Sequence, residues 1–190
     1  MTSYLRPAVS LMALFTLLLG LGYPLAMTSV AQGLFPSAAN GSLIRNAKGE
    51  TVASSLIGRT FEGDGYFQPR PSAAGAGYDA SASAGSNLGP TDKRLIERVS
   101  ADVAAYQAAN GPGPVPADAV TTSASGLDPH ISPANAERQL ARVATARGLS
   151  ETRLRDLVSL HTERPWLGFV GTPGVNTVTL NLALDGIVAR

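Results

Sequence analysis

The chain begins with a long apolar stretch that charged residues flank but do not enter. Residues 7–31 read PAVSLMALFTLLLGLGYPLAMTSVA, and no Asp, Glu, Lys or Arg occurs between Arg6 and Arg45. A membrane-spanning helix needs about 20 mostly apolar residues. The pattern therefore predicts a membrane anchor over residues 1–32, with the span at about 8–31.

A cleaved signal peptide is the alternative for this stretch. Residues 11–21 would be its apolar core, and Ser29-Val30-Ala31 offers small residues for cleavage. The length of the apolar run favours the anchor. Arg6 is the one charged residue before the span, so the positive-inside rule predicts a cytoplasmic N-terminus and an extracytoplasmic domain over residues 33–190.

Apolar residues recur at helical spacing in three later segments. The first, from Pro90-Thr91 to Asn110-Gly111, carries Leu95, Val99, Val103 and Tyr106. The second covers residues 133–147, with Ser132 as its N-cap, Pro133 at its first position and Gly148 as its stop. The third starts after Ser150 and carries Leu154, Leu157, Val158 and His161 on one face.

Alternation and turn residues predict strands elsewhere. Residues 42–44 and 51–53 flank a turn that ends at Gly49, which predicts a hairpin. Residues 56–58 and 66–67 are candidate short strands, and the alternation over 177–184 predicts a half-buried strand. The sum is an α+β fold: a single N-terminal transmembrane helix, then a small extracytoplasmic domain of about three helices and a modest antiparallel sheet.

Between the predicted hairpin and the first of these helices lies a segment rich in Ala, Gly, Ser and Pro, residues 69–90. Such composition is typical of a flexible linker. Tyr78 and Asn87 stand among its small residues, and Gly85-Ser86-Asn87-Leu88-Gly89-Pro90 resembles a specified turn. We therefore expect an ordered, irregular surface loop.

Composition narrows the function classes. The net charge is +1, which argues against nucleic acid as a partner, since a basic footprint would be expected. The chain has no cysteine, which excludes a disulfide scaffold and a thiolate metal site. No phosphate-binding loop or dinucleotide fingerprint is present. The turn at residues 85–89, near Lys93 and Arg94, is a minor candidate for an anion site at a helix start.

Candidate chemistry is concentrated in Ser125-Gly126-Leu127-Asp128-Pro129-His130-Ile131-Ser132-Pro133, where one of two histidines stands beside a carboxylate between prolines. A hydrolase would use His130 as base, Asp128 as orienting acid, and Ser72 or Ser125 as nucleophile. No nucleophile-elbow motif accompanies them, and the histidines lack metal-ligand spacing. A stiff loop shaped by hydrogen bonds between Asp128 and His130 is the favoured interpretation.

Four segments together resemble a known family. They are Phe67-Gln68-Pro69-Arg70-Pro71-Ser72-Ala73, Gly85-Ser86-Asn87-Leu88-Gly89-Pro90-Thr91, the segment 125–133, and Val175-Asn176 with Leu180-Asn181-Leu182-Ala183-Leu184-Asp185. They resemble the C subunit of the bacterial Kdp potassium-transporting ATPase, in order and spacing and over essentially the whole chain.

The resemblance implies a non-catalytic accessory subunit of a high-affinity, ATP-driven potassium uptake complex. The implied partners are a channel-like potassium-binding subunit, a P-type ATPase subunit and the lipid bilayer of the inner membrane. It further implies a need for the chain in assembly and a catalytic-chaperone role that raises the nucleotide affinity of the ATPase subunit. ATP and potassium are then handled by the complex, with no cofactor, metal or catalytic residue on this chain.

The candidate residues for partner contact or loop shaping are polar and aromatic. Protein interfaces favour arginine and aromatic side chains, and the set is Arg70, Tyr78, Asn87, Asp128 and His130. Trp166 is a further candidate anchor, with a place in the core as its alternative. The competing function, a membrane-anchored periplasmic hydrolase, would rest on His130 and Asp128.

Overall fold

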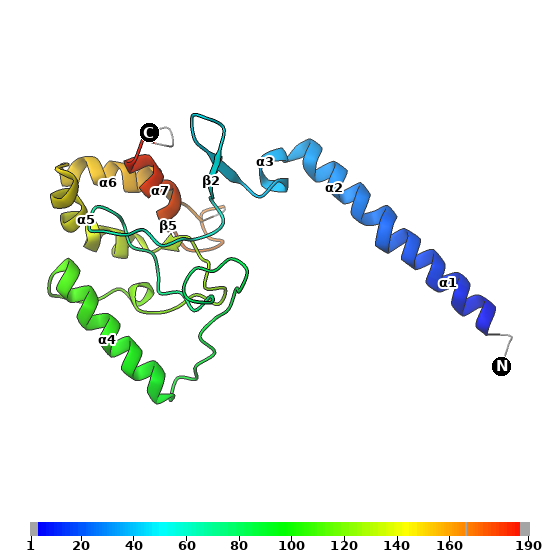
Figure 1. The fold of residues 1–190 in the computed structure, drawn as a ribbon, viewed down its shortest axis with the longest axis horizontal. Helices are drawn as coiled ribbons and strands as arrows, with labels where there is room; N and C mark the ends of the chain where they lie inside the picture. The colour runs from blue at the N-terminus through cyan, green and yellow to red at the C-terminus, as the bar shows by residue number, and fades with distance from the viewer. Residues whose placement is uncertain (1–3, 166, 187–190) are drawn as a thin grey trace. The chain divides into compact units, whose positions relative to one another are not determined.

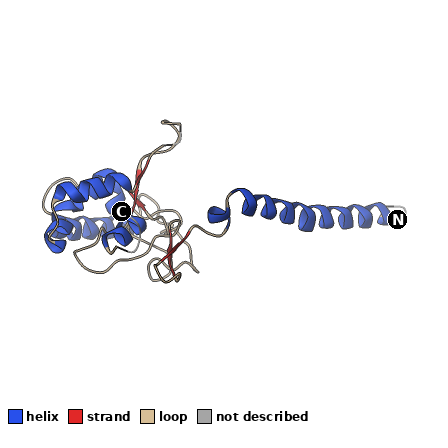
Figure 2. Ribbon diagram, turned by 90° about the horizontal axis from the view of Figure 1, so that it is seen from above, coloured by secondary structure: helices blue, strands red, loops and turns tan. Residues whose placement is uncertain are grey.

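The computed structural model describes residues 4–165 and 167–186, so the expectation for Trp166 lies outside the described residues. The chain divides into two compact units, Met1–Leu43 and Ile44–Arg190. Figures 1 and 2 show the helices and strands of each unit.

The first unit is dominated by one continuous apolar helix. It consists of α1 (Leu5–Leu17), a π-helical turn η1 (Leu18–Gly22) and α2 (Tyr23–Leu34), followed by the short α3 (Pro36–Ala39). Residues 5–34 form 30 helical residues, none of them buried within the chain. At 1.5 Å per residue this is about 45 Å, more than the ~30 Å hydrocarbon core of a bilayer. The helix is therefore long enough to be the single membrane span that the sequence predicts.

The second unit begins with the predicted hairpin. The strands β1 (Leu43–Arg45) and β2 (Thr51–Ser54) pair with each other. The turn between them is closed by Asn46, whose side-chain oxygen accepts hydrogen bonds from the backbone N–H groups of Lys48 and Glu50, both at 3.0 Å. Asparagine suits such a turn because its short side chain reaches the backbone two residues on.

The three predicted helices are confirmed as α4 (Lys93–Asn110), α5 (Pro133–Arg147) and α6 (Glu151–Leu160). Ser132 and Ser150 cap α5 and α6 through their side-chain oxygens, and Gly148 ends α5 in the left-handed conformation. The α4 helix begins later than expected because Asp92 is its cap. A short 3₁₀ turn, η2 (Ala117–Ala119), separates α4 from the next strand.

The predicted strand over 177–184 is wrong: α7 (Thr177–Leu184) is a helix, and Asn176 caps it by accepting hydrogen bonds from Val178 and Thr179. Leu180 packs into the main core, whereas Val178 and Leu182 pack into a second cluster with the hairpin. A helix buried on several sides has no polar face, so its sequence lacks the helical stripe. The apolar residues alternate there because the helix is buried on several sides and not because the segment is a β-strand.

A small antiparallel sheet joins the distant parts of this unit. Its strand order is β3 (His130–Ile131), β5 (Gly174–Asn176) and β4 (Thr162–Glu163). Val175 lies between Ile131 on one side and Thr162 on the other. The sheet thereby brings the candidate loop to the edge of the helical core.

The core lies among α5, α6, α7 and this sheet. Figure 1 shows these helices grouped together, with α4 apart from them, and none of the α4 residues is fully buried. The main cluster consists of Phe67, Ile131, Ala136, Leu140, Val143, Ala144, Leu154, Leu157, Val158, Val175 and Leu180.

The two predicted short strands at 56–58 and 66–67 are not strands. Phe67 lies in an extended segment, but its backbone N–H and C=O pair with the side-chain amide of Asn181, both at 2.9 Å. The neighbouring Gln68 pairs in the same way with Gln139, at 2.7 and 3.1 Å. Side chains from two helices thus take the place of a neighbouring strand.

Candidate functional site

Four of the five predicted site residues meet at one place in the second unit. Arg70 and Tyr78 come from the irregular loop, and Asp128 and His130 come from the segment that leads into β3. Asn87 does not join them. It is exposed, and its φ of 53° identifies it as a turn residue, since asparagine adopts the left-handed conformation more readily than most side chains.

Asp128 is at the centre of the group. Its Oδ1 accepts a hydrogen bond from the His130 backbone N–H at 3.0 Å and lies 3.3 Å from His130 Nδ1. Its Oδ2 accepts one from Arg70 Nη1 at 3.0 Å. Partial burial acts to raise the pKa of Asp128, but the hydrogen bonds from His130 and the charge of Arg70 outweigh it and lower the pKa.

Arg70 connects three segments of the chain. Besides Asp128, its guanidinium donates to the carbonyl oxygens of Thr121 and Thr122, each at 3.3 Å. A planar guanidinium with several fixed donors suits this kind of bridging, which lysine cannot reproduce. The side chain is only 23% exposed, so its charge is largely committed within the chain.

Tyr78 holds the irregular loop against the same group. Its hydroxyl donates to the Arg70 carbonyl at 2.8 Å, and its backbone N–H donates to Ser72 Oγ at 2.8 Å. Burial raises the pKa of the Tyr78 hydroxyl, with the Asp128 charge adding to the effect. The ring lies so close to Gly58 that a Cβ there would come within 2.5 Å of it. The loop is therefore ordered, as its interspersed aromatic residue predicts.

His130 lies between two carboxylates. Its Nδ1 faces Asp128, and its Nε2 lies 3.2 Å from Glu163 Oε1 on β4. The hydrogen bond to Asp128 raises the pKa of His130, burial opposes the rise, and Glu163 adds to it. The site therefore favours the imidazolium form, with a carboxylate oxygen within 3.3 Å of each ring nitrogen, although Nε2 makes no hydrogen bond to Glu163. Glu163 was not among the residues predicted for this site.

This arrangement does not assemble a hydrolytic triad. A base needs a free nitrogen within hydrogen-bond reach of a nucleophile, but the outer nitrogen of His130 faces Glu163. Ser72 Oγ donates to the Gly126 carbonyl at 2.6 Å. Ser125 Oγ accepts from Leu127 N–H at 3.1 Å. The hydrolase alternative is therefore not favoured, because both serines serve the shape of the loops.

The expected anion site at the start of α4 is disfavoured as well. The Asp92 carboxylate occupies the helix N-terminus, where it accepts the Arg94 N–H at 2.9 Å and pairs with the Arg94 guanidinium at 2.8 Å. Gly85 faces the Ala124 carbonyl, which a Cβ would approach to 3.0 Å. This turn packs against the segment that leads into the candidate loop.

A cavity of about 350 Å³ opens beside the group. Its lining includes Arg70, Asp128, His130 and Glu163, together with Asp118. Asp118 accepts hydrogen bonds from the Ser132 N–H and hydroxyl, both at 2.8 Å. Within residues 4–165 and 167–186 no three His, Asp or Glu side chains are grouped so as to hold a metal ion.

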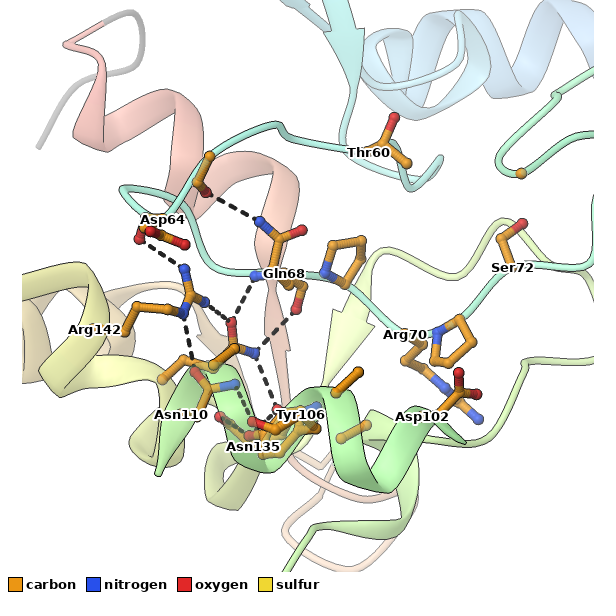
Figure 3. A pocket seen from close by; sticks show the side chains of 18 of the residues that line it. Thr60, Asp64, Gln68, Arg70, Ser72, Asp102, Tyr106, Asn110, Asn135 and Arg142 are labelled. Carbon is orange, nitrogen blue, oxygen red and sulfur yellow. Dashed lines mark hydrogen bonds between the residues drawn. The ribbon is translucent and has the colours of Figure 1, made fainter. Parts of the chain in front are cut away.

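A second cavity, of about 510 Å³, lies between α4 and the segment around Gln68 (Figure 3). At its base Gln139 accepts hydrogen bonds from Gln68 N–H and Arg142 Nη2, both at 2.7 Å, and donates to Asn135 Oδ1 at 3.0 Å. Tyr106 donates to the same Asn135 oxygen at 2.9 Å. The amides of Gln139 and Asn135 are each only 1% exposed. Sequence reasoning missed this network, although polar residues beside Ala136 and Leu140 on a helix were its available signal.

Comparison with known proteins identifies the chain's relatives. Residues 5–186 match the family described as KdpC: K+-transporting ATPase, c chain. A potassium-transporting ATPase KdpC subunit of Caulobacter vibrioides is 59% identical over 185 residues, covering 97% of this chain and 94% of the relative. The protein of the same name from Koribacter versatilis is 54% identical over 186 residues, covering 98% and 96%. One from Sorangium cellulosum is 53% identical over 189 residues, covering 98% and 99%.

These matches cover both the apolar helix and the domain with the Asp128–His130 group. On this likeness, over nearly its whole length, the chain belongs to the KdpC family of K+-transporting ATPase c chains.

Proposed function

We propose that this chain is a non-catalytic accessory subunit of an ATP-driven potassium uptake complex and that it promotes assembly of that complex. The observation that carries the proposal is the state of the Asp128–His130 group. The polar atoms of Asp128, His130 and Arg70 are used to join loops and strands of the chain itself. Contacts of this kind hold a surface in shape. His130 Nε2 makes no hydrogen bond, but the oxygen 3.2 Å from it belongs to the Glu163 carboxylate, and the hydroxyls of Ser72 and Ser125 are used within the loops.

The proposed partners are a channel-like potassium-binding subunit and a P-type ATPase subunit. The relatives' names, which specify a subunit of a potassium-transporting ATPase, support this assignment. The helix over residues 5–34 would pack among the spans of these subunits and the lipid, and Arg6 favours a cytoplasmic N-terminus. The second unit would then lie outside the inner membrane.

The partner-facing surface would be the rim of the cavity beside His130. Glu163, whose side chain is 66% exposed, stands at this rim. Arg70 and Tyr78 act mainly within the chain, where they shape the loops below the rim. Asn87 is an exposed turn residue suited to peripheral contact. The domain would thereby cap or stabilise the entry side of the channel-like subunit.

We propose further that the chain raises the nucleotide affinity of the ATPase subunit, an effect that needs a route through the membrane. A domain outside the membrane cannot touch nucleotide inside it, so coupling would run through the span and the subunit interfaces. Coupling between distant sites requires an element with two arrangements that both sites bias. The π-helical turn at Leu18–Gly22 is a suitable element, since such turns often mark functional positions in helices. ATP and potassium would be bound by the other subunits, with no cofactor on this chain.

The experiment that tests the proposal removes the anchor while keeping the domain. Residues 35–190 are exported behind a cleavable signal, and the complex is purified through a tag on the ATPase subunit. We expect the full chain to co-purify and the truncated chain to be lost, together with potassium-stimulated ATP hydrolysis. A chimera with an unrelated single span separates simple tethering from specific packing. A complete and active complex that lacks the chain would refute the proposal.

A further inference from the structure

The connection between β4 and β5 exposes an unusual amount of apolar surface. Leu167 is 65% exposed, Phe169 78% and Val170 49%. All residues from 167 to 173 are exposed, and a Cβ on Gly168 or Gly171 would meet no atom within 4 Å. Large apolar side chains gathered at an exposed tip mark an interaction site rather than a core.

The backbone of this tip is held in a costly conformation. Gly168 N–H donates to the Pro165 carbonyl at 3.0 Å, which closes a turn. The third position of that turn is Leu167, with a φ of 54°. Glycine or asparagine is preferred at such a position, because a bulky side chain there is strained. Within the domain, a glycine or asparagine would be more stable than leucine at this turn position. We take the exposed leucine there as a sign that its side chain contacts something outside the domain.

Charge around the tip favours a lipid surface. Arg164 is the only charged residue from position 164 to position 184. Its side chain is exposed, and Glu163 before it is directed to His130. Apolar and aromatic side chains suit the boundary of headgroups and acyl chains, and an exposed cation beside them can meet an anionic headgroup there.

The tether keeps the second unit, which carries this tip, within reach of a bilayer. Residues 35–43 connect the end of α2 to the second unit, and nine residues reach at most about 30 Å when fully extended. The effective concentration of membrane around the domain is therefore high, so that even a contact of low affinity with lipid would form most of the time.

We propose that the tip formed by Leu167, Phe169 and Val170 inserts into the interfacial region of the bilayer as a second membrane attachment beside the helical anchor. The inference rests on the membrane anchoring and not on the accessory role in potassium transport. It assigns a lipid ligand to a part of the chain that the Asp128–His130 group does not use. Two attachments of different strength would restrict the orientation of the domain on the membrane.

The test uses the absence of cysteine in the chain. A nitroxide spin label is placed on Phe169→Cys in the otherwise unchanged full chain, which is reconstituted in vesicles of phosphatidylethanolamine and phosphatidylglycerol. Accessibility to molecular oxygen, which partitions into lipid, is compared with accessibility to a water-soluble nickel chelate. Ala146→Cys, on the exposed end of α5, is the matched control.

We expect the Phe169→Cys label to be more accessible to oxygen than to nickel and the Ala146→Cys label to show the reverse. Adding Leu167→Asn and Val170→Ser should shift the Phe169→Cys label toward nickel accessibility, since both changes remove apolar contact and the first also relieves strain. Nickel accessibility equal to that of the control would overturn the proposal. So would a label that is water-exposed in vesicles but shielded from both reagents in the assembled complex, because a partner subunit would then cover the tip. Loss of the complex on anchor removal is scored separately, so either proposal can fail alone.

Discussion

Asp128 and His130 join three segments of the second unit. Asp128 Oδ1 accepts a hydrogen bond from the His130 backbone N–H, two positions along the chain and across one stiff proline. Its Oδ2 accepts one from Arg70, 58 residues away. His130 in turn lies beside Glu163, which the pairing of β4 with β5 brings to this place. These contacts hold the segment 125–133 against the irregular loop and the sheet.

Gly126 provides a test of how tightly the candidate loops are packed. Its φ is +68°, and a Cβ would lie 2.5 Å from the Ala84 carbonyl and 2.7 Å from Ala74 N. Gly148 has a nearly equal φ of +63° with open space around it. We expect Gly148→Ala to lower the free energy of unfolding by about 1 kcal/mol through backbone strain alone. Gly126→Ala should lower the free energy of unfolding by roughly 1–3 kcal/mol more than Gly148→Ala does, because its new methyl group would be overpacked.

The measurement is denaturant unfolding of the full chain in detergent, with both variants compared to the wild type. The matched φ cancels the backbone contribution, so the difference reports the steric contact. Equal destabilisation by the two variants would show that Ala74 and Ala84 do not pack against Gly126.

The two histidines predict opposite pH dependences of stability. The raised pKa of His130 means that its contribution is fully present below the unfolded value of about 6.5 and is lost as pH rises through the folded pKa. Burial lowers the pKa of His161, so its contribution is present above that value and is lost as pH falls. His130→Gln should therefore lower the free energy of unfolding by about 1 kcal/mol near pH 5.5 and by distinctly less near pH 8.5.

Unfolding of the full chain at the two pH values checks this expectation, with His161→Gln as the counterpart whose larger cost falls at the higher pH. A His130→Gln penalty that grows with pH would contradict the ion pairing of His130 with Asp128 and Glu163.

At the scale of elements, local signals were reliable where one face of an element is exposed. The α5 helix has a serine cap, a proline at its start, a left-handed glycine at its end and one apolar face, and its bounds match the prediction. The α7 helix has apolar neighbours on several sides, so its alternating Val178, Leu180 and Leu182 imitated a strand. Its Asn176 cap was the signal that could have corrected the assignment.

Asn181 tests whether side chains replace a strand around Phe67. Its amide is fully buried and pairs with both backbone groups of Phe67. Asn181→Ala leaves a buried donor and acceptor without partners, so we expect a loss of about 2–4 kcal/mol in the free energy of unfolding. Asn87→Gly is the control, since it is exposed and glycine accepts its positive φ, and it should stay within about 0.5 kcal/mol. Similar losses of unfolding free energy for both variants would argue against the pairing of the Asn181 amide with the Phe67 backbone.

Gly20 tests the packing role of the apolar helix. A Cβ there would meet only Thr16 Cγ2, at 3.9 Å, so the chain itself does not require glycine, and glycine costs about 1 kcal/mol relative to alanine in a helix. Small residues let membrane helices approach closely. We expect Gly20→Leu to reduce the yield of the co-purified complex several-fold, whereas Leu19→Ile leaves it unchanged. An unchanged yield with Gly20→Leu would exclude close packing at this position.

At the scale of the whole molecule, the chain combines an exposed apolar helix with a domain in which a few buried polar residues pair with the chain's own backbone. The sequence predicted both parts, because a long uncharged run and capped helices are local features. Partner contacts could not be predicted from it, because they depend on surfaces that several distant segments build together. The contacts of Asp128 with Arg70, 58 residues away, and of His130 with Glu163 also arise from tertiary packing, so sequence spacing gives no signal for them. We expect this chain to act through the assembly of the other subunits.

The most direct test is to purify the complex from cells with and without this chain, through a tag on the ATPase subunit, and to measure potassium-stimulated ATP hydrolysis against ATP concentration. We expect that without the chain the other subunits co-purify poorly and that the remaining activity needs more ATP. Supplying the full chain should restore both, and His130→Gln should restore them in part. A stable complex with unchanged potassium stimulation and an unchanged ATP requirement in the absence of the chain would contradict the account.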